Sequence, residues 1–85
     1  MKKKLSFRQL LAEIAGWYGT TAILTAYALV SFNLISGYGI IFQLLNLTGA
    51  IGIIIIASYK KVAQSIVLNI VWSIVAIFAI VSIVL

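Results

Sequence analysis

The chain has 85 residues, of which 65% are hydrophobic and 8% are charged, whereas an average soluble domain is about 45–50% apolar and about 25% charged. A soluble fold of this length has too small an interior to bury so much apolar surface, so the composition excludes an ordinary soluble domain. The chain has no Cys, no His and a single acidic residue, so we expect no enzyme, no metal site and no cofactor, because thiolate sites, catalytic triads and carboxylate pairs all lack their residues.

Residues 5–14 are predicted to form a short amphipathic helix of their own. Ser6 followed by Gln9 fits a capping box, which typically begins a helix. Apolar side chains recur at helical spacing on one side, and polar side chains occupy the other. Such a helix lies in the membrane interface, and we expect Gly16 to let the chain turn into the membrane. The apolar side consists of Phe7, Leu10, Leu11 and Ile14, and the polar side consists of Lys4, Arg8, Gln9 and Glu13.

Glu13 allows two interpretations. An acidic side chain at a membrane mouth is a candidate for proton-coupled function. Glu13 also follows Arg8 and a cluster of lysines at the edge of the first apolar run, where a solvated ion pair is the stronger explanation.

Three charge-free runs follow, at residues 14–32, 38–58 and 62–85. Each is close to the roughly 20 residues that a helix needs to cross a hydrocarbon layer of about 30 Å. Their length and the absence of two-residue alternation distinguish them from outer-membrane barrel strands. The sequence therefore predicts an all-α integral membrane protein, with one membrane domain of three transmembrane helices behind the interfacial helix.

The basic residues predict the orientation of these helices. All of them precede the first run or lie between the second and third runs, whereas the turn at residues 33–37 and the end of the chain carry none. The positive-inside rule then places the N-terminus and the Lys60–Lys61 turn in the cytoplasm and the C-terminus on the other side of the membrane. A cleavable signal peptide is not expected, because the first apolar run is too long for a signal core.

The same basic residues are expected to contact anionic lipid headgroups rather than nucleic acid. A basic residue near an anionic membrane surface contributes roughly 1 kcal/mol to binding. The predicted headgroup contacts are Lys2, Lys3, Lys4, Arg8, Lys60 and Lys61.

Each predicted span has one side of small or polar residues and a broad side of larger apolar residues. This division is typical of a helix that faces protein on one side and lipid on the other. The inward side of the first span contains Gly16, Thr20, Tyr27 and Ser31. That of the second contains Gln43, Asn46, Ala50 and Ala57, with Gly49 and Gly52 beside them. That of the third contains Ser65, Asn69, Trp72, Ala76 and Ala79.

The two inward asparagines must find partners, because a buried amide without hydrogen bonds is costly in hydrocarbon. They differ in expected depth by roughly a third of the bilayer core, so each is expected to need its own partner. One interpretation is that they bond across helices and hold the bundle together. The other is that they line a polar cavity for a small uncharged solute. The candidate lining of that cavity is Thr20, Tyr27, Gln43, Asn46, Asn69 and Trp72.

Four segments carry a resemblance to a family of small, uncharacterised bacterial membrane proteins. They read GWYG at 16–19, AYAL at 26–29, NLTGA at 46–50 and NIVW at 69–72. This resemblance extends over nearly the whole chain and implies the three-span architecture without implying an activity. More distantly, the inward Asn and Trp resemble those of bacterial half-transporters of the sweet-sugar type, in which two copies form one solute pathway. The chain lacks their Pro-Gln motif, because it contains no Pro.

Two functions are compatible with these patterns. The first is a half-transporter or channel-like unit that forms a homo-oligomer, most simply a dimer, because three helices enclose too little volume for a solute path. The second is a non-transporting structural or assembly subunit that presents its basic cytoplasmic side to lipid or to a larger membrane complex.

Overall fold

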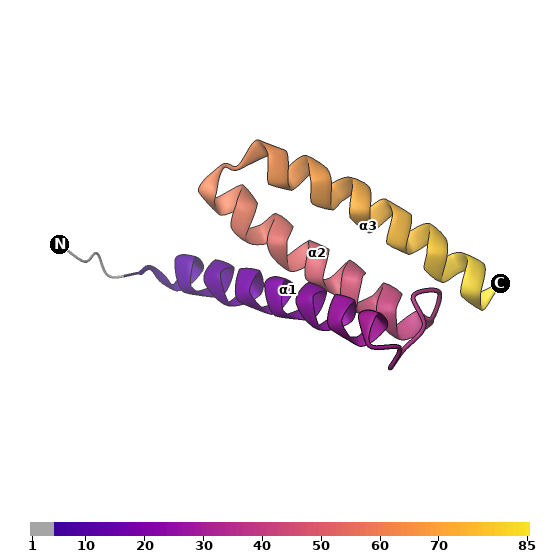
Figure 1. Cartoon of the computed structure of the whole chain (residues 1–85). Helices are drawn as coiled ribbons and strands as arrows, with labels where there is room; N and C mark the ends of the chain where they lie inside the picture. Colours follow the sequence, from indigo (N-terminus) through magenta and orange to yellow (C-terminus); the bar gives the residue numbers. More distant parts are fainter. Residues whose placement is uncertain (1–4) are drawn as a thin grey trace.

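The computed structural model describes residues 5–85, which form three helices (Figure 1). Helix α1 comprises Phe7–Ser31, α2 comprises Ile40–Lys60 and α3 comprises Ala63–Val84. Helices α1 and α3 both pack against α2, and in the described part of the chain they do not pack against each other. The middle helix α2 runs antiparallel to its two neighbours (Figure 1). The all-α prediction with three long helices is therefore confirmed.

Helix α1 begins at the predicted capping box but runs without a break to Ser31, so the separate short helix expected at residues 5–14 is wrong. The Gln9 N–H donates to Ser6 Oγ at 3.1 Å, and the Ser6 N–H donates to Gln9 Oε1 at 3.0 Å. Gly16 lies inside the helix and is buried, and a Cβ at this position would lie 2.6 Å from Ile56 Cγ2 of α2. This glycine serves close helix packing rather than a turn.

Small residues form the interface between α1 and α2. A Cβ at Gly19 would overlap the carbonyl oxygen of Gly49, and one at Gly52 would overlap that of Ala15. Close backbone approach of this kind is the usual basis of helix association where lipid replaces water. The buried residues of α1 are Ala12, Gly16, Gly19, Ala22 and Ala26, and those of α2 are Asn46, Gly49, Ala50, Gly52 and Ala57.

The inward side predicted for the first span is therefore only partly correct. Gly16 is buried, but Tyr27 and Ser31 are exposed and Thr20 is half-buried. The residues that contact α2 are instead small ones such as Gly19 and Ala26, each one position before a predicted inward residue. Their small size allows α2 to approach closely. The predicted inward side of the second span agrees closely with the burial of α2.

Helix α1 ends in a left-handed turn. Asn33 has a φ of 60°, and the following Leu34 N–H donates to Leu29 O at 2.8 Å. Together they form the hydrogen-bonded C-terminal motif in which one residue takes the left-handed conformation. Asn tolerates that conformation better than most residues with a Cβ.

We expect Asn33→Val to lower the free energy of unfolding by about 1–2 kcal/mol, because a β-branched residue is strained at this φ. Asn33→Gly is the matched control and should be neutral or stabilising, since glycine takes this conformation without strain. Titration of the purified protein with sodium dodecyl sulfate, followed by circular dichroism, measures both changes. Equal destabilisation by the two variants would contradict this explanation.

Helices α2 and α3 are long and apolar enough to cross a membrane, whereas α1 does not meet that criterion. Only a minority of the residues in the apolar stretch of each are buried. Large apolar side chains such as Ile51, Ile55, Ile74 and Phe78 are instead exposed. The surface of these two helices is thus unlike that of a soluble protein, whose core helices bury their apolar residues.

Candidate functional site

Three hollows lie between the helices, and together they contain all six predicted lining residues. The Glu13 hollow, of about 200 Å³, is lined by Glu13, Gly16, Trp17, Thr20 and Ile56. The Tyr27 hollow, of about 290 Å³, is lined by Ile23, Tyr27, Leu68, Asn69 and Trp72. The Asn46 hollow, of about 120 Å³, is lined by Phe42, Gln43, Asn46, Trp72, Val75 and Ala76.

Asn46 is the most unusual polar residue of the site. It lies in the second turn of α2 with only 5% of its surface exposed. Its Oδ1 is fully buried and has no hydrogen-bond partner within residues 5–85. A buried acceptor without a donor costs about 1–3 kcal/mol, so Asn46 is suited to accept a hydrogen bond from a group outside those residues.

Asn69 is buried to a similar degree, but its amide nitrogen is bonded within its own helix. Its Nδ2 donates to Ser65 O at 2.9 Å and lies 3.4 Å from Ser65 Oγ. The Ser73 hydroxyl in turn donates to Asn69 O at 2.8 Å. The amide therefore bonds along α3, and among the described residues it makes no hydrogen bond to another helix. The two asparagines do not contact each other through hydrogen bonds, as their expected depths predicted.

Aromatic side chains separate the Tyr27 and Asn46 hollows. Trp72 of α3 lines both hollows. Tyr27 of α1 packs edge-to-face on Phe42 of α2, with ring centroids 6.4 Å apart and an interplanar angle of 86°. The structure thus brings Tyr27, Asn46, Asn69 and Trp72 to adjoining hollows, although they come from three helices.

The other two predicted lining residues lie at the margins. Gln43 lines the Asn46 hollow, and its Nε2 makes a long contact of 3.5 Å to Gly37 O in the α1–α2 connection. Thr20 lies in the Glu13 hollow, apart from the other five. A hydrogen bond that the sequence did not suggest links Tyr18 Oη to Thr48 Oγ1 at 2.6 Å, and it joins α1 to α2.

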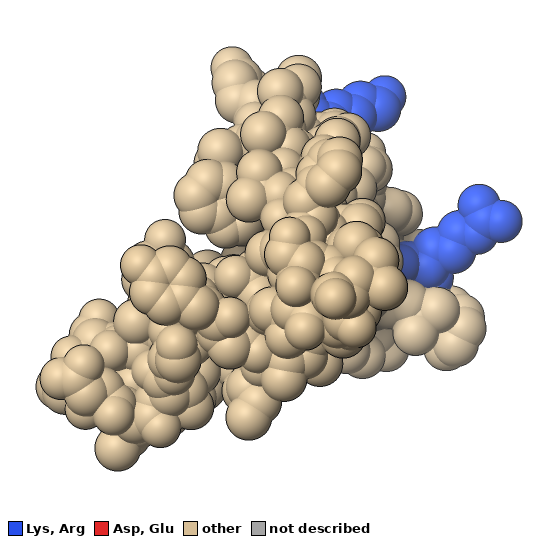
Figure 2. Space-filling view, turned by 90° about the vertical axis from the view of Figure 1, so that its right-hand side faces the viewer, with Lys and Arg blue, Asp and Glu red and all other residues tan. Residues whose placement is uncertain are grey.

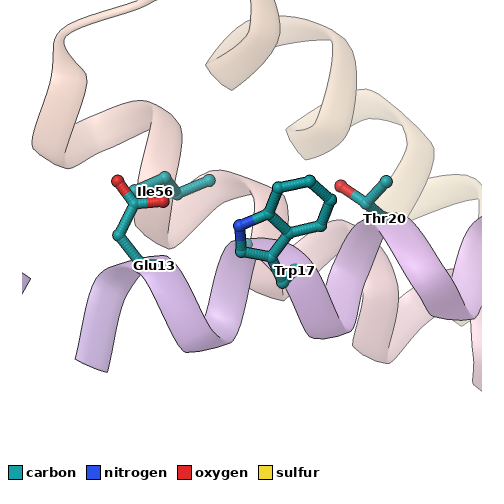
Figure 3. A pocket seen from close by; sticks show the side chains of 5 residues that line it. Glu13, Trp17, Thr20 and Ile56 are labelled. Carbon is teal, nitrogen blue, oxygen red and sulfur yellow. The ribbon is translucent and has the colours of Figure 1, made fainter. Parts of the chain in front are cut away.

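The Glu13 hollow combines a charge with an apolar wall. Glu13, Trp17 and Thr20 project from one side of α1, and the indole ring of Trp17 lies between the other two (Figure 3). Glu13 Oε2 lies 3.0 Å from Lys60 Nζ at the end of α2. This contact favours the ion-pair interpretation of Glu13. The partner, however, is Lys60 of α2 and not Arg8 or the lysines that precede Glu13 in the sequence.

The predicted headgroup residues are only partly visible in the structure. Lys2, Lys3 and Lys4 lie outside the described residues, and Arg8, Lys60 and Lys61 are exposed. Figure 2 views the molecule from the side of the α1–α2 connection and shows a surface that is almost entirely uncharged, with basic side chains projecting at one edge. No pairing beyond that of Lys60 with Glu13 is found among residues 5–85.

These observations define an all-helical protein with two helices apolar enough to cross a membrane and with two uncharged hollows and one hollow that contains Glu13. The model of an uncharacterised protein family matches residues 12–85, and the chain belongs to that family. No curated protein and no solved structure matches the chain. The match supports the expected family of small uncharacterised proteins, whereas the resemblance to sweet-sugar half-transporters stays a prediction.

Proposed function

We propose that this chain is a bacterial inner-membrane protein that crosses the membrane three times. The support is the exposure of large apolar side chains over α2 and α3, which lipid solvates and water does not. After Glu13, α1 carries no charge to its end at Ser31, and Arg8 and Glu13 lie in the first two turns of the helix. That end of α1 then stands at the cytoplasmic headgroup level, where charged side chains are readily accommodated.

Within the membrane, the Tyr27 and Asn46 hollows form half of a pathway for a small uncharged solute. The observation that carries this proposal is that Asn46, a residue that lines a hollow, has a buried Oδ1 with no donor within residues 5–85. The residues that line the two hollows carry no charge, but they offer amide groups, a phenol and an indole. Such a lining suits a neutral molecule with hydroxyl or amide groups.

A second copy of the chain completes the pathway. Helices α1 and α3 do not meet, so the Tyr27 hollow between them is open on one side. Three helices of this length cannot enclose a solute path alone, and two-fold dimers are the commonest symmetric assemblies. A parallel dimer would bring the open sides together around a common cavity.

The function is tested in reconstituted vesicles by the rate at which they re-swell in glycerol, erythritol or urea after osmotic shrinkage. We expect wild-type vesicles to re-swell faster than protein-free vesicles with at least one solute. Asn46→Leu should reduce that excess rate about tenfold, because it replaces the buried unpaired acceptor with an apolar side chain of similar branching. Asn69→Leu is the matched control; it should insert normally and reduce the rate much less, since the Asn69 amide is already bonded to Ser65.

Assembly is measured beside permeability, by crosslinking Trp72→Cys in native membranes. A crosslinked dimer together with solute entry supports the proposal. Vesicles that behave like protein-free ones, combined with stoichiometric co-purification of an unrelated protein in mild detergent, would replace it with the role of a non-transporting subunit.

A further inference from the structure

We infer that the Glu13 hollow binds a phospholipid whose headgroup carries both a primary ammonium and a phosphate, as in phosphatidylethanolamine. This inference rests on the proposed insertion of α1 and α2 in a membrane, but it does not depend on solute transport. It also differs from a general attraction of basic residues to anionic lipid, because it requires the single acidic residue of the chain.

One charge lines the hollow and the opposite charge is bound to it, because Glu13 lines the hollow and Lys60 contacts Glu13. Glu13 Oε2 binds Lys60 Nζ, and within the described residues the other carboxylate oxygen accepts no hydrogen bond. The lysine ammonium has three donors, of which this contact uses one. A headgroup ammonium can therefore bind the second carboxylate oxygen while its phosphate binds Lys60. A phosphate that bound Lys60 without an accompanying ammonium would draw Lys60 away from Glu13 and leave the Glu13 carboxylate without a positive charge beside it.

The ion pair is accessible enough to be rearranged by a ligand. The side chains of Lys60 and Glu13 are 57% and 32% exposed. Exposed pairs contribute about 0–1 kcal/mol, so the pair can open or rotate to admit a headgroup at little cost. A bound zwitterion would keep both charges compensated throughout.

An apolar wall continues from these charges along α1. The Trp17 indole follows Glu13, with its nitrogen turned toward the Glu13 side, and Ile56 of α2 lies opposite (Figure 3). Indole rings favour the headgroup region, where the ring is apolar and the N–H can donate to an ester carbonyl. Gly16 lies at the floor of the hollow, where Ile56 packs directly against it, and the remaining space of about 200 Å³ is enough for the first carbons of an acyl chain.

The position of the hollow agrees with this occupant. Lys60 is the last residue of α2, and Glu13 lies in the second turn of α1, so both stand at the end of the bundle opposite the α1–α2 connection (Figure 1). In the proposed orientation this end is cytoplasmic. The charges then lie at headgroup depth, and Trp17 and Ile56 lie at the depth of the first acyl carbons.

The test is native mass spectrometry of the full chain in mild detergent with an equimolar mixture of phosphatidylethanolamine, phosphatidylcholine and phosphatidylglycerol of identical acyl chains. We expect a preference of about fivefold or more for phosphatidylethanolamine. Phosphatidylcholine lacks N–H donors for Glu13, and phosphatidylglycerol lacks the ammonium. Glu13→Gln should abolish the preference. Lys61→Asn is the matched control and should keep it, because Lys61 adjoins Lys60 but makes no ion pair with Glu13 among the described residues, and Asn suits its φ of 58°.

Equal binding of the three lipids by the wild type, or an unchanged preference in Glu13→Gln, would overturn the inference. If Glu13→Gln is poorly folded by circular dichroism, the double variant Glu13→Gln/Lys60→Gln removes the pair without leaving one charge alone and should show no preference. Asn46→Leu should retain the lipid preference, which separates this site from the solute pathway. Before the lipid experiment, membranes that contain the protein are washed at alkaline pH. Release of the protein by this wash would disprove the membrane proposal on which the inference rests.

Discussion

Gly19→Ala is expected to lower the free energy of unfolding by about 2 kcal/mol, and Gly19→Leu is expected to separate α1 from α2. A Cβ at Gly19 would overlap the carbonyl oxygen of Gly49, which belongs to the backbone and cannot rotate away. Overpacking of this kind costs about 1–3 kcal/mol or more. Alanine is intrinsically the better helix former by about 1 kcal/mol, so a net loss measures the packing against α2.

The control for this substitution is Gly37→Ala in the α1–α2 connection. Its φ is not positive, and the nearest side-chain atom to a new Cβ, Val30 Cγ1, lies at an ordinary 3.6 Å. We expect no more than a few tenths of a kcal/mol of change. Unfolding in sodium dodecyl sulfate, together with a crosslink between cysteines on α1 and α2, reports stability and packing separately. A stable, crosslinked Gly19→Leu protein would show that the two helices do not pack as described.

A reporter fused after Leu85 is expected to lie outside the cytoplasm in every molecule. Six basic residues stand on one predicted side of the membrane and none on the other, and this asymmetry determines orientation in short-looped membrane proteins. Alkaline phosphatase fused there should be fully active, and green fluorescent protein exported through the same route should be dark. The opposite pair of signals would require an even number of spans or the inverse orientation.

Moving basic residues from one side of the membrane to the other tests the cause of this orientation. Moving the basic pair by Lys60→Asn and Lys61→Asn, with two lysines placed at Ser36 and Gly37, should produce a mixture of orientations, because the bias is then weakened. The same fusions measure the fraction of each. An unchanged orientation would assign the topology to the N-terminal basic residues alone.

The sequence determined the class of structure, because composition and charge spacing act over whole segments. Long charge-free runs predicted the three helices, whose observed ends differ from the predicted ones by only a few residues, apart from the start of α1. The Ser6 capping box was likewise readable, since its two hydrogen bonds join residues three positions apart.

The contact between α1 and α2 could also have been found more fully in the sequence. Pairs of small residues four positions apart, at Ala12 and Gly16 and at Ala22 and Ala26, are the usual pattern of closely packed membrane helices. Attention to polar residues instead placed Tyr27 on the inward side, although it is half exposed. Polar residues can lie beside an interface that small residues make.

Only the tertiary structure decided which polar groups are satisfied. Helical periodicity does not distinguish Asn46 from Asn69, because both fall on the predicted inward sides of their helices. The rotamer of Asn69 turns its amide back to Ser65, four residues earlier, whereas Asn46 faces a hollow made with α3 and finds no donor within residues 5–85. The pairing of Glu13 with Lys60, which are 47 positions apart, likewise follows from the antiparallel packing of α1 on α2. Sequence patterns report which side of a helix a residue occupies, but hydrogen bonds and ion pairs depend on distances between helices that no single-helix pattern contains.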